Sequence, residues 1–349
     1  MRLNQAVIPH YRSEMIPIER LKRLVALNEK YLREKPTWYI IDDKLKYFKI
    51  RNDFRLFTEQ FFSIFAKKII GLDTINYQVA YVRTISQYGK SSEEVTKCGL
   101  LSNSFQDCKH NYYLVSELMN AEISDFVFYG GYTLENLLKF FKDYLANDDY
   151  TKNELFLIRL FIADAFTNQE DRNYHNIGFE IPKIPGVSHN IRLHPQRLAL
   201  DKKNHQFLED NGNNHWKLKG LSPTKVYDSE RILGIDHHRQ FKYIEGDTWK
   251  PIFPYTMQTS YISKEAAKKD SLENFEGLDP NLLSLYIDHP DICKPLFERL
   301  AYDDEYRKIL EIFKGNNAQI TLSQNSIDYF TLIFEDKREV FKRILKYGR

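Results

Sequence analysis

A polar hexapeptide near the middle of the chain, Asp171-Arg172-Asn173-Tyr174-His175-Asn176, has the residue types of a catalytic loop. Its aspartate stands five residues before its last asparagine, which is the D-x-x-x-x-N spacing of phosphoryl-transfer enzymes. In such a loop the aspartate accepts the proton of the attacking hydroxyl group, and the asparagine holds a magnesium ion. Exposed loops rich in Asp, Arg and Asn are common, so the hexapeptide needs partners elsewhere in the chain.

The residues on either side of the hexapeptide have the pattern of a buried helix and a short strand. Apolar side chains before it recur at steps of three and four, as on one face of a helix: Leu155, Ile158, Ile162, Ala165 and Phe166. This pattern stops at Thr167, and Asn168-Gln169-Glu170 marks the exit from the helix. Residues 177–181 then alternate in the manner of a strand. A loop between two such elements holds its side chains rigid and within reach of solvent.

A lysine and a glutamate nearer the N-terminus are the candidate partners of this loop. Lys49 lies in the second of two β-prone runs, residues 38–41 and 45–50, which predict a hairpin. Glu59 lies in the first turn of a predicted helix, residues 57–70, which the glycine after it is expected to end. A strand lysine is most often an exposed charge, and an acid in a first turn is expected from the helix dipole. Paired with each other, they would hold an ammonium group in place against nucleotide phosphates.

The order of the remaining elements suggests where a nucleotide base would lie. Residues 112–118 predict a strand with an apolar centre, and residues 37–119 together predict a small sheet with one helix. The following region is mainly helical, so that a cleft is expected between the two. Backbone groups around Glu117 and Leu118 would then face an adenine ring. This expectation follows from the order of the elements alone.

Composition and charge exclude several classes of protein. The 349 residues include 42% hydrophobic and 28% charged residues, as expected for a soluble globular chain of about two domains. The net charge of +2 predicts no strong attraction to nucleic acid or to a membrane. The three cysteines have neither a disulfide framework nor a zinc spacing, which favours a reducing compartment. Neither a secretory signal nor a membrane-spanning run is recognisable.

Four segments together resemble the HipA-like kinases. They are Tyr47-Phe48-Lys49-Ile50, Thr58-Glu59 with the helix that ends in Ile70-Gly71-Leu72, Gly99-Leu100-Leu101-Ser102-Asn103-Ser104-Phe105, and the run from Asp171 to Phe179. These bacterial serine/threonine kinases include persistence toxins and a smaller single-domain CtkA type. The resemblance extends over about residues 37–220, and the helical C-terminal region suits it.

The resemblance implies an α+β, two-lobed protein-kinase-like fold. Residues 1–36 would be an N-terminal extension, with a helix predicted over residues 18–32. Residues 37–119 would form a small lobe of sheet plus helix, the kinase N-lobe. Residues 120–349 would form the larger, mainly helical C-lobe together with the helical C-terminal region.

The resemblance also implies a role for each matched residue. Lys49 would contact the α- and β-phosphates of ATP, and Glu59 would position it. Asp171 would be the general base and Asn176 a ligand of Mg²⁺. The family loop is often written D-R-H-x-x-N, whereas this chain has Asn173 in place of that histidine and a histidine two residues later. This departure leaves the roles of the aspartate and the asparagine unaffected. Any role of the family histidine has no matching residue at position 173.

A second magnesium aspartate lies, in the family, in a run that resembles F-D-N-G. The match here is Phe207-Leu208-Glu209-Asp210-Asn211-Gly212, which assigns Asp210 to this role. A carboxylate suits the role because Mg²⁺ prefers hard oxygen ligands. Asp201 is the competing choice, because a long polar insertion over residues 182–206 separates the catalytic loop from the aspartate. Asp210 is favoured because Asn211-Gly212 would provide a turn after it.

One departure from kinases concerns the loop that covers the phosphates. No glycine-rich loop precedes Lys49, where the turn is Asp42-Asp43-Lys44. Gly89-Lys90-Ser91 is not a phosphate-binding loop, because the upstream glycine is missing at Thr84 and no suitable helix follows. The chain is therefore open to a second interpretation, an inactive nucleotide-binding or antitoxin-binding module. The joint presence of the four charged positions and the asparagine argues against it.

These observations predict an ATP- and Mg²⁺-dependent kinase that transfers the γ-phosphate to Ser/Thr hydroxyls of a protein. Autophosphorylation is a family-level hypothesis, and a lipid or small-molecule acceptor is an alternative. The expected partners are a protein substrate and an antitoxin or host protein, with neither nucleic acid nor membrane. The expected location is the bacterial cytoplasm, with export or translocation without a signal peptide as an alternative.

Overall fold

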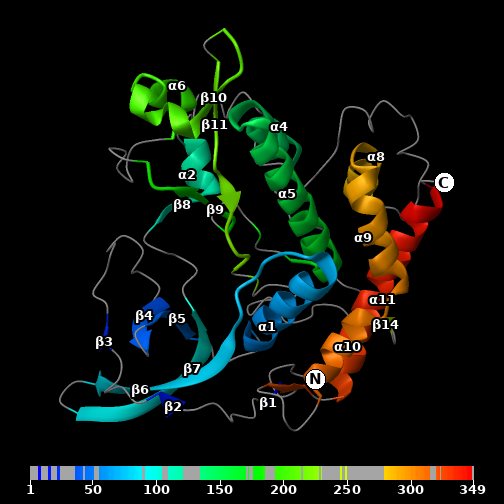
Figure 1. The fold of residues 1–349 in the computed structure, drawn as a ribbon. Coiled ribbons are helices and arrows are strands. Elements are labelled where there is room, and N and C mark those ends of the chain that lie inside the picture. Colours follow the sequence, from blue (N-terminus) through cyan, green and yellow to red (C-terminus); the bar gives the residue numbers. More distant parts are fainter. Residues whose placement is uncertain are drawn as a thin grey trace.

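The chain has an α+β fold, which a computed structural model shows as a large sheet, smaller sheets and a group of helices (Figure 1). The structure describes residues 7–8, 15–16, 22–23, 36–41, 44–50, 55–88, 91–103, 109–120, 134–169, 172, 176–184, 193–213, 215–227, 229, 244–245, 248–249, 279–314, 320–322 and 324–347. The predicted α+β class is confirmed. Asp171, Asn173 and His175 of the polar hexapeptide lie outside the described residues, as does the acidic turn at Asp42-Asp43.

A six-stranded sheet occupies the N-terminal part of the chain, with the strand order β2-β6-β7-β5-β4-β3. Its strands are β2 (Met15–Ile16), β3 (Lys22–Arg23), β4 (Pro36–Ile41), β5 (Lys44–Ile50), β6 (Gln78–Tyr88) and β7 (Ser91–Asn103). The predicted hairpin is confirmed by β4 and β5, in which Trp38 pairs with Tyr47. The helix predicted over residues 18–32 is wrong at Lys22–Arg23, which instead pair with β4; the other positions of that helix lie outside the described residues.

The rejected phosphate-loop motif lies at the tip of the β6–β7 hairpin. Tyr88 pairs with Ser91 across this hairpin, and Gly89-Lys90 between them lie outside the described residues. A phosphate-binding loop of that type leads from a strand into a helix, whereas here the chain continues as the long strand β7. The rejection of this motif is therefore confirmed.

Strand β7 passes so close to β5 that one of its positions requires glycine. Gly99 pairs with Ile50, next to Lys49. A Cβ atom at Gly99 would overlap the carbonyl oxygen of Lys49 and lie 2.8 Å from the ring of Phe48. The absence of a side chain at this position therefore permits the pairing that fixes the strand on which Lys49 lies.

A helix inserted between strands β5 and β6 connects the sheet to the rest of the molecule. Helix α1 (Arg55–Phe65) continues into a π-helical turn, η4 (Ala66–Ile70), and ends at Gly71 with a φ of 79°, as predicted. Three phenylalanines at steps of four line one face of α1. The phenylalanines and their ring neighbours are Phe57 against Phe330, Phe61 against Phe334 and Phe65 against Phe166, with ring centroids 5.2, 5.3 and 5.2 Å apart. Helix α1 is thereby packed against two helices of the later chain.

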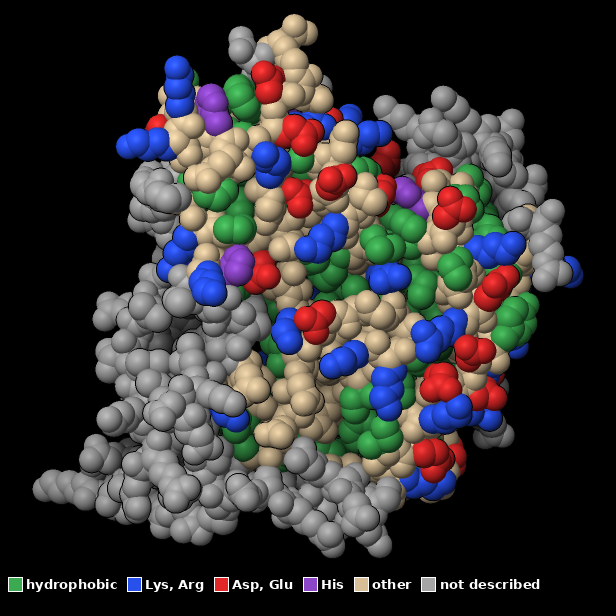
Figure 2. Space-filling view, in the orientation of Figure 1, with side chains coloured by type: hydrophobic (Ala, Val, Ile, Leu, Met, Phe, Trp, Pro, Cys, Tyr) green, Lys and Arg blue, Asp and Glu red, His purple; other side chains and the backbone are tan. Residues whose placement is uncertain are grey.

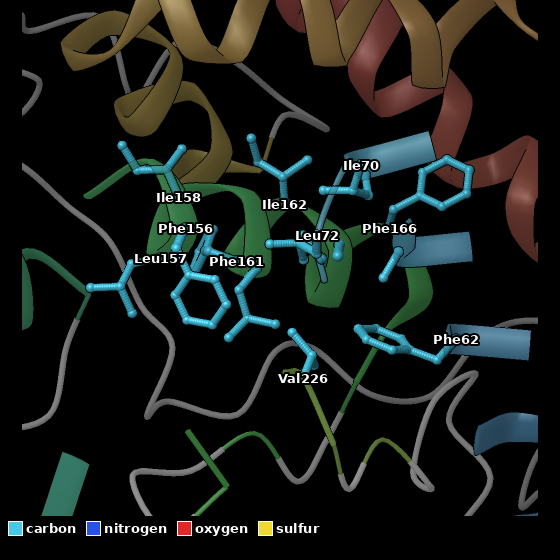
Figure 3. Close-up of a cluster of buried hydrophobic side chains, with 14 of the residues drawn as sticks. Phe62, Ile70, Leu72, Phe156, Leu157, Ile158, Phe161, Ile162, Phe166 and Val226 are labelled. Atoms are coloured by element: carbon cyan, nitrogen blue, oxygen red, sulfur yellow. The ribbon is translucent and has the colours of Figure 1, made fainter. Parts of the chain in front are cut away.

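The other helices make up most of the remaining described chain. They are α2 (Val115–Asn120), α4 (Leu134–Tyr144), α5 (Asn147–Thr167), α6 (Pro195–Leu198), the 3₁₀ helix η5 (Lys202–Phe207), α8 (Pro280–Asp288), α9 (Pro290–Tyr302), α10 (Glu305–Ile312) and α11 (Gln324–Tyr347). Side chains from α5 form one buried cluster with Ile70, Leu72 and Val226 (Figure 3). Helix α5 thus contributes many of the buried side chains of the core. It ends at Thr167, as the sequence predicts.

Smaller sheets join segments that are distant in the sequence. Their strands are β8 (His110–Leu114), β9 (Gly178–Pro182) and β12 (Ser222–Pro223) in one sheet, β10 (Leu208–Asp210) with β11 (Trp216–Leu218), β13 (Ile244–Glu245) with β14 (Thr248–Trp249), and β1 (Val7–Ile8) with β15 (Thr321–Leu322). The strand predicted over residues 177–181 is confirmed by β9. The strand predicted over residues 112–118 is wrong in its second half, because β8 ends at Leu114 and helix α2 begins there.

The surface carries charges of both signs. On the face shown in Figure 2, acidic and basic side chains are interspersed, in keeping with the net charge of +2. No helix among the described residues combines the length and the apolar character that crossing a bilayer requires.

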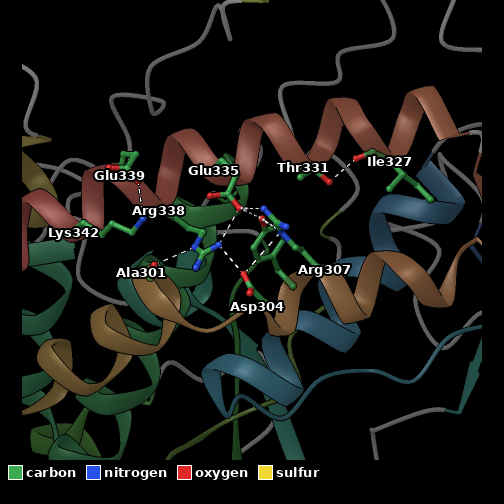
Figure 4. Close-up of polar contacts among 10 residues, drawn as sticks. Ala301, Asp304, Arg307, Ile327, Thr331, Glu335, Arg338, Glu339 and Lys342 are labelled. Carbon is green, nitrogen blue, oxygen red and sulfur yellow. Dashed lines mark hydrogen bonds and ion pairs between the residues drawn. The ribbon is translucent and has the colours of Figure 1, made fainter.

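A polar network joins the last helices of the chain (Figure 4). Arg338 on α11 donates to the carbonyl oxygen of Ala301 (3.0 Å), to Asp304 (2.8 Å) and to Glu335 (2.9 Å). Glu335 also accepts hydrogen bonds from Arg307 (2.6 Å) and from the hydroxyl of Tyr306. Burial acts to raise the pKa of Glu335, but these hydrogen bonds outweigh it and lower the pKa to about 2.

We expect the Glu335→Gln variant to be less stable than the parent at neutral pH. Because the pKa is depressed in the folded state, the carboxylate stabilises the fold above its ordinary pKa of 4.5, and this contribution is lost as the pH falls toward 2. Allowing for partial exposure, the loss in the free energy of unfolding should be about 1–2 kcal/mol at pH 7 and smaller at pH 3. Urea denaturation at both pH values measures it. Glu339→Gln on the same helix is the control, since Glu339 is exposed and Lys342 is its one ion-pair partner among the described residues; an equal loss in both variants would contradict the prediction.

Candidate functional site

Lys49 and Glu59 form a buried ion pair between the large sheet and helix α1. The ammonium group of Lys49 donates to Oε1 of Glu59. Lys49 is 8% exposed and Glu59 is 1% exposed. Removing two charges from water costs free energy, so that such a pair by itself is weak evidence for a role in stability. The predicted pairing is present, and it holds the ammonium group in a defined position.

The two ends of the polar hexapeptide are fixed by α5 and β9. The chain leaves α5 at Asn168, whose φ of 53° is in the left-handed region and whose amide donates to the carbonyl of Asp164. Strand β9 begins at Gly178, two residues after Asn176. Arg172 and Asn176 are therefore placed by a buried helix on one side and a paired strand on the other.

Arg172 is the most connected residue of this loop among those the structure describes. It is 3% exposed, and its guanidinium binds both carboxylate oxygens of Asp164, at 3.0 and 3.2 Å. Its other donors reach the carbonyl oxygens of Asn176 (3.3 Å) and Tyr227 (2.9 Å) and the hydroxyl of Ser229 (2.7 Å). Burial raises the pKa of Asp164, and the adjacent guanidinium opposes this effect. The sequence gives no sign of this role, because the acceptors lie up to 57 positions from Arg172.

The segment that contains Tyr227 and Ser229 is held against the loop by strand-like contacts. Thr224 donates from its amide and from its hydroxyl to the carbonyl of Gly178, at 3.0 Å in each case. A Cβ atom at Gly178 would lie 2.8 Å from that hydroxyl, so the close approach requires glycine. On its other side, Val226 exchanges backbone hydrogen bonds with residues 73 and 75, which follow α1.

Ser229 connects this segment to the ion pair. Its amide donates to Oε2 of Glu59 at 3.2 Å, while Oε1 of the same carboxylate accepts from Lys49. Ser229 is 2% exposed. The structure thus brings together four pieces of chain: strand β5, helix α1, the loop with Arg172 and Asn176, and the segment around Ser229.

Asp228 stands in the middle of the anchored segment and was missed by the sequence analysis. It lies between Tyr227 and Ser229, both of which accept hydrogen bonds from Arg172, although Asp228 itself lies outside the described residues. It is followed two residues later by Glu230. The sequence alone gives no clear signal for Asp228, because its connection to the hexapeptide depends on contacts made only in the folded chain.

Asp210 and Asp201 both lie on the surface. Asp210 ends β10, is exposed, and accepts a hydrogen bond from the amide of Gly212 (2.9 Å) in the predicted turn. Asp201 is also exposed and caps η5 by accepting from the amide of Lys203 (3.0 Å). Among the contacts that the structure describes, none joins either carboxylate to Lys49, Arg172 or Asn176. The turn after Asp210 is confirmed, but the position of Asp210 gives its metal-binding role no support.

Glu117 and Leu118 lie on helix α2 and not at the end of a strand. The carboxylate of Glu117 accepts a hydrogen bond from the amide of Leu114 (2.8 Å), just before the helix. Leu118 is 2% exposed, so its side chain is part of the core. The start of α2 nevertheless adjoins the end of the polar hexapeptide, since the amide of Val115 donates to the carbonyl of Ile177 (2.9 Å).

Among the described residues, no group of three or more His, Cys, Asp or Glu side chains is arranged to hold a metal ion. The donors that could do so in the sequence, Asp171 and Asp228, lie outside that part of the chain, whereas Asn176 lies within it. Hard oxygen atoms from an amide and carboxylates suit Mg²⁺.

Comparison with known proteins gives a likeness in structure and none in sequence. No protein-family model and no curated protein matches the sequence. The crystal structure of the Helicobacter pylori proinflammatory kinase CtkA has a TM-score of 0.52 and 10% identity, over 96% of this chain and 99% of that one. HipA of Shewanella oneidensis, from a complex with HipB and operator DNA, has a TM-score of 0.41 and 11% identity, over 85% of this chain and 58% of that one, a likeness too weak to support a conclusion. The chain therefore has the fold of the CtkA kinase, so that the resemblance to HipA-like kinases, drawn from the sequence motifs, is confirmed at the level of the fold.

Proposed function

We propose that this protein is an ATP-dependent kinase of two lobes. The small lobe, residues 37–119, would contain the large sheet and α1, and the larger lobe would comprise residues 120–349. One observation carries the proposal: the buried Lys49–Glu59 pair is joined through Ser229 to the loop that holds Asn176. A strand lysine paired with a helix glutamate, beside a D-x-x-x-x-N loop, is the arrangement that phosphoryl transfer in kinases requires.

The proposed reaction assigns one task to each side chain. Lys49 binds the α- and β-phosphates of ATP, and Glu59 holds the ammonium group in place. Asp171 orients the acceptor hydroxyl and accepts its proton. The acceptor oxygen forms a bond to the γ-phosphorus while the bond from that phosphorus to the β,γ-bridging oxygen breaks, and ADP leaves. Most of the rate enhancement would come from positioning and from neutralising charge.

The donor set fits a magnesium ion. Asn176 and Asp228 would hold it, because both carry hard oxygen donors and because Arg172 ties the two segments together through the carbonyls of Asn176 and Tyr227 and the hydroxyl of Ser229. When bound, Mg²⁺ neutralises the developing charge on the β- and γ-phosphates. Asp228 thereby takes the role that the sequence motif assigns to Asp210.

The acceptor that we propose is a serine or threonine hydroxyl of a protein, including a residue of the kinase itself. The resemblance of the motifs to HipA-like kinases and the CtkA fold support this choice over a lipid or a small molecule. Label transfer from γ-labelled ATP to candidate protein, lipid and small-molecule acceptors tests this choice.

Mg·ATP is expected to stabilise the protein against thermal unfolding. At a concentration one hundred times the Kd, binding adds about 2.7 kcal/mol to the free energy of unfolding. Incubation with γ-labelled ATP should also transfer label to protein. Asp171→Asn should retain the thermal shift but lose transfer by about a hundredfold or more, because the base is lost while the phosphate contacts remain. A parent protein that shows neither shift nor transfer would instead be an inactive module.

A further inference from the structure

Arg172 uses its whole guanidinium group in one buried network. The group has five N–H donors, and the structure gives an acceptor for each. Nε and one donor of Nη2 bind Asp164, the two donors of Nη1 bind the carbonyls of Asn176 and Tyr227, and the second donor of Nη2 binds the hydroxyl of Ser229. The ring of Phe62 lies under the guanidinium, 5.5 Å from centroid to Cζ. A lysine has three donors and no fork, and cannot replace these contacts.

The contacts of Arg172 fall into two groups. One group fixes the loop to helix α5, and the other binds the segment that contains Asp228. The pair with Asp164 fixes the loop to helix α5, as in many buried Arg–Asp pairs. The contacts with Tyr227 and Ser229 serve a different segment, because they hold a backbone carbonyl before Asp228 and a side-chain hydroxyl after it. The hydroxyl of Ser229 belongs only to this second group, so that it can be removed while the Asp164–Arg172 pair is kept.

Ser229 links Arg172 to the ion pair of Lys49 and Glu59. Its hydroxyl accepts from Arg172 (2.7 Å), and its amide donates to the Glu59 oxygen that Lys49 does not occupy (3.2 Å). A continuous series of hydrogen bonds therefore runs from Asp164 through Arg172, Ser229 and Glu59 to Lys49. Every one of these residues is less than a tenth exposed, so that solvent screens the series little.

We infer that Arg172 and Ser229 are positioning residues, which act through Glu59 to hold Lys49 at the distance from the catalytic loop at which it binds the nucleotide phosphates. This inference rests on the proposed kinase function and extends it, since neither residue is required to touch ATP. A movement of the loop would be passed to the ammonium group, and the nucleotide affinity would therefore depend on Ser229.

The affinity for Mg·ADP, measured by calorimetry, tests the inference. Ser229→Ala is expected to weaken binding by about tenfold or more, because a charged hydrogen bond in a buried series is lost. Ser229→Thr keeps the hydroxyl and should restore most of the affinity. Ser284→Ala is the matched control, as it removes another fully buried serine hydroxyl on α8 and should leave the affinity unchanged.

A double-mutant cycle separates this role from a merely structural one. If Ser229 acts through Lys49, then Ser229→Ala should weaken Mg·ADP binding by less than about twofold in a Lys49→Met background. If the two effects multiply in full, or if Ser229→Ala binds as the parent does, the inference is wrong while the kinase proposal stands. A parent that binds no Mg·ADP would overturn the proposed function and the inference together.

Discussion

Asp228→Asn is expected to lower the rate of phosphoryl transfer from ATP by about a thousandfold, whereas Asp210→Asn should leave the rate within about threefold of the parent. Both changes remove one carboxylate and keep the shape of the side chain. They differ in their neighbours, because the segment around Asp228 is bonded to Arg172 and to Glu59, while the described contact of the Asp210 carboxylate is with the amide of Gly212 in an exposed turn. The comparison of the two variants therefore decides which aspartate binds the metal ion: Asp210, which the sequence motif indicates, or Asp228, which lies in the segment bonded to Arg172.

The measurement is the initial rate of label transfer from γ-labelled ATP at several concentrations of Mg²⁺. Loss of a metal ligand should also raise the concentration of Mg²⁺ needed for half-maximal rate, which loss of an unrelated carboxylate would not do. The melting temperature of each variant serves as the control for folding. A large loss in Asp210→Asn together with full activity in Asp228→Asn would return the metal site to the hairpin of β10 and β11.

Lys49→Met should abolish transfer and destabilise the fold, and a second substitution should separate the two effects. Methionine leaves the Glu59 carboxylate, which is 1% exposed, without its ammonium partner. Removing one member of a buried pair costs about 3–5 kcal/mol, whereas replacing both members by neutral groups of similar size is often nearly neutral. The double variant Lys49→Met/Glu59→Gln should therefore recover most of the lost stability.

Activity should not recover with stability. In the proposed mechanism the ammonium group supplies the charge that binds the phosphates, so both variants should be slower than the parent by about a hundredfold or more. Chemical denaturation and the transfer assay, run on the same preparations, give the two quantities. Recovery of both in the double variant would show that the ion pair has a structural role alone.

Local patterns were sufficient to predict much of the fold. The exit of α5 at Asn168 and the end of the α1 segment at Gly71 depend on left-handed backbone conformations that Asn and Gly adopt readily. The hairpin of β4 and β5 depends on β-prone runs on either side of a short turn. Each of these features is decided within a few residues, and each is confirmed.

The errors concern features that distant contacts decide. Residues 112–118 are β-prone, yet the strand stops at Leu114, where Glu117 binds the preceding amide and Val115 pairs with Ile177. The same holds for the site. Lys49 and Glu59 were recognisable because the spacing and order of two elements are local, whereas the importance of Arg172 depends on acceptors that only the folded chain brings together.

The stacking of the α1 phenylalanines on α11 has a consequence for how the site is made during synthesis. Phe57 and Phe61 rest on Phe330 and Phe334, roughly 270 positions further along the chain. While the ribosome is still producing the intervening chain, the helix that bears Glu59 lacks its supporting surface. The nascent polypeptide should therefore not bind nucleotide until α11 has emerged from the exit tunnel.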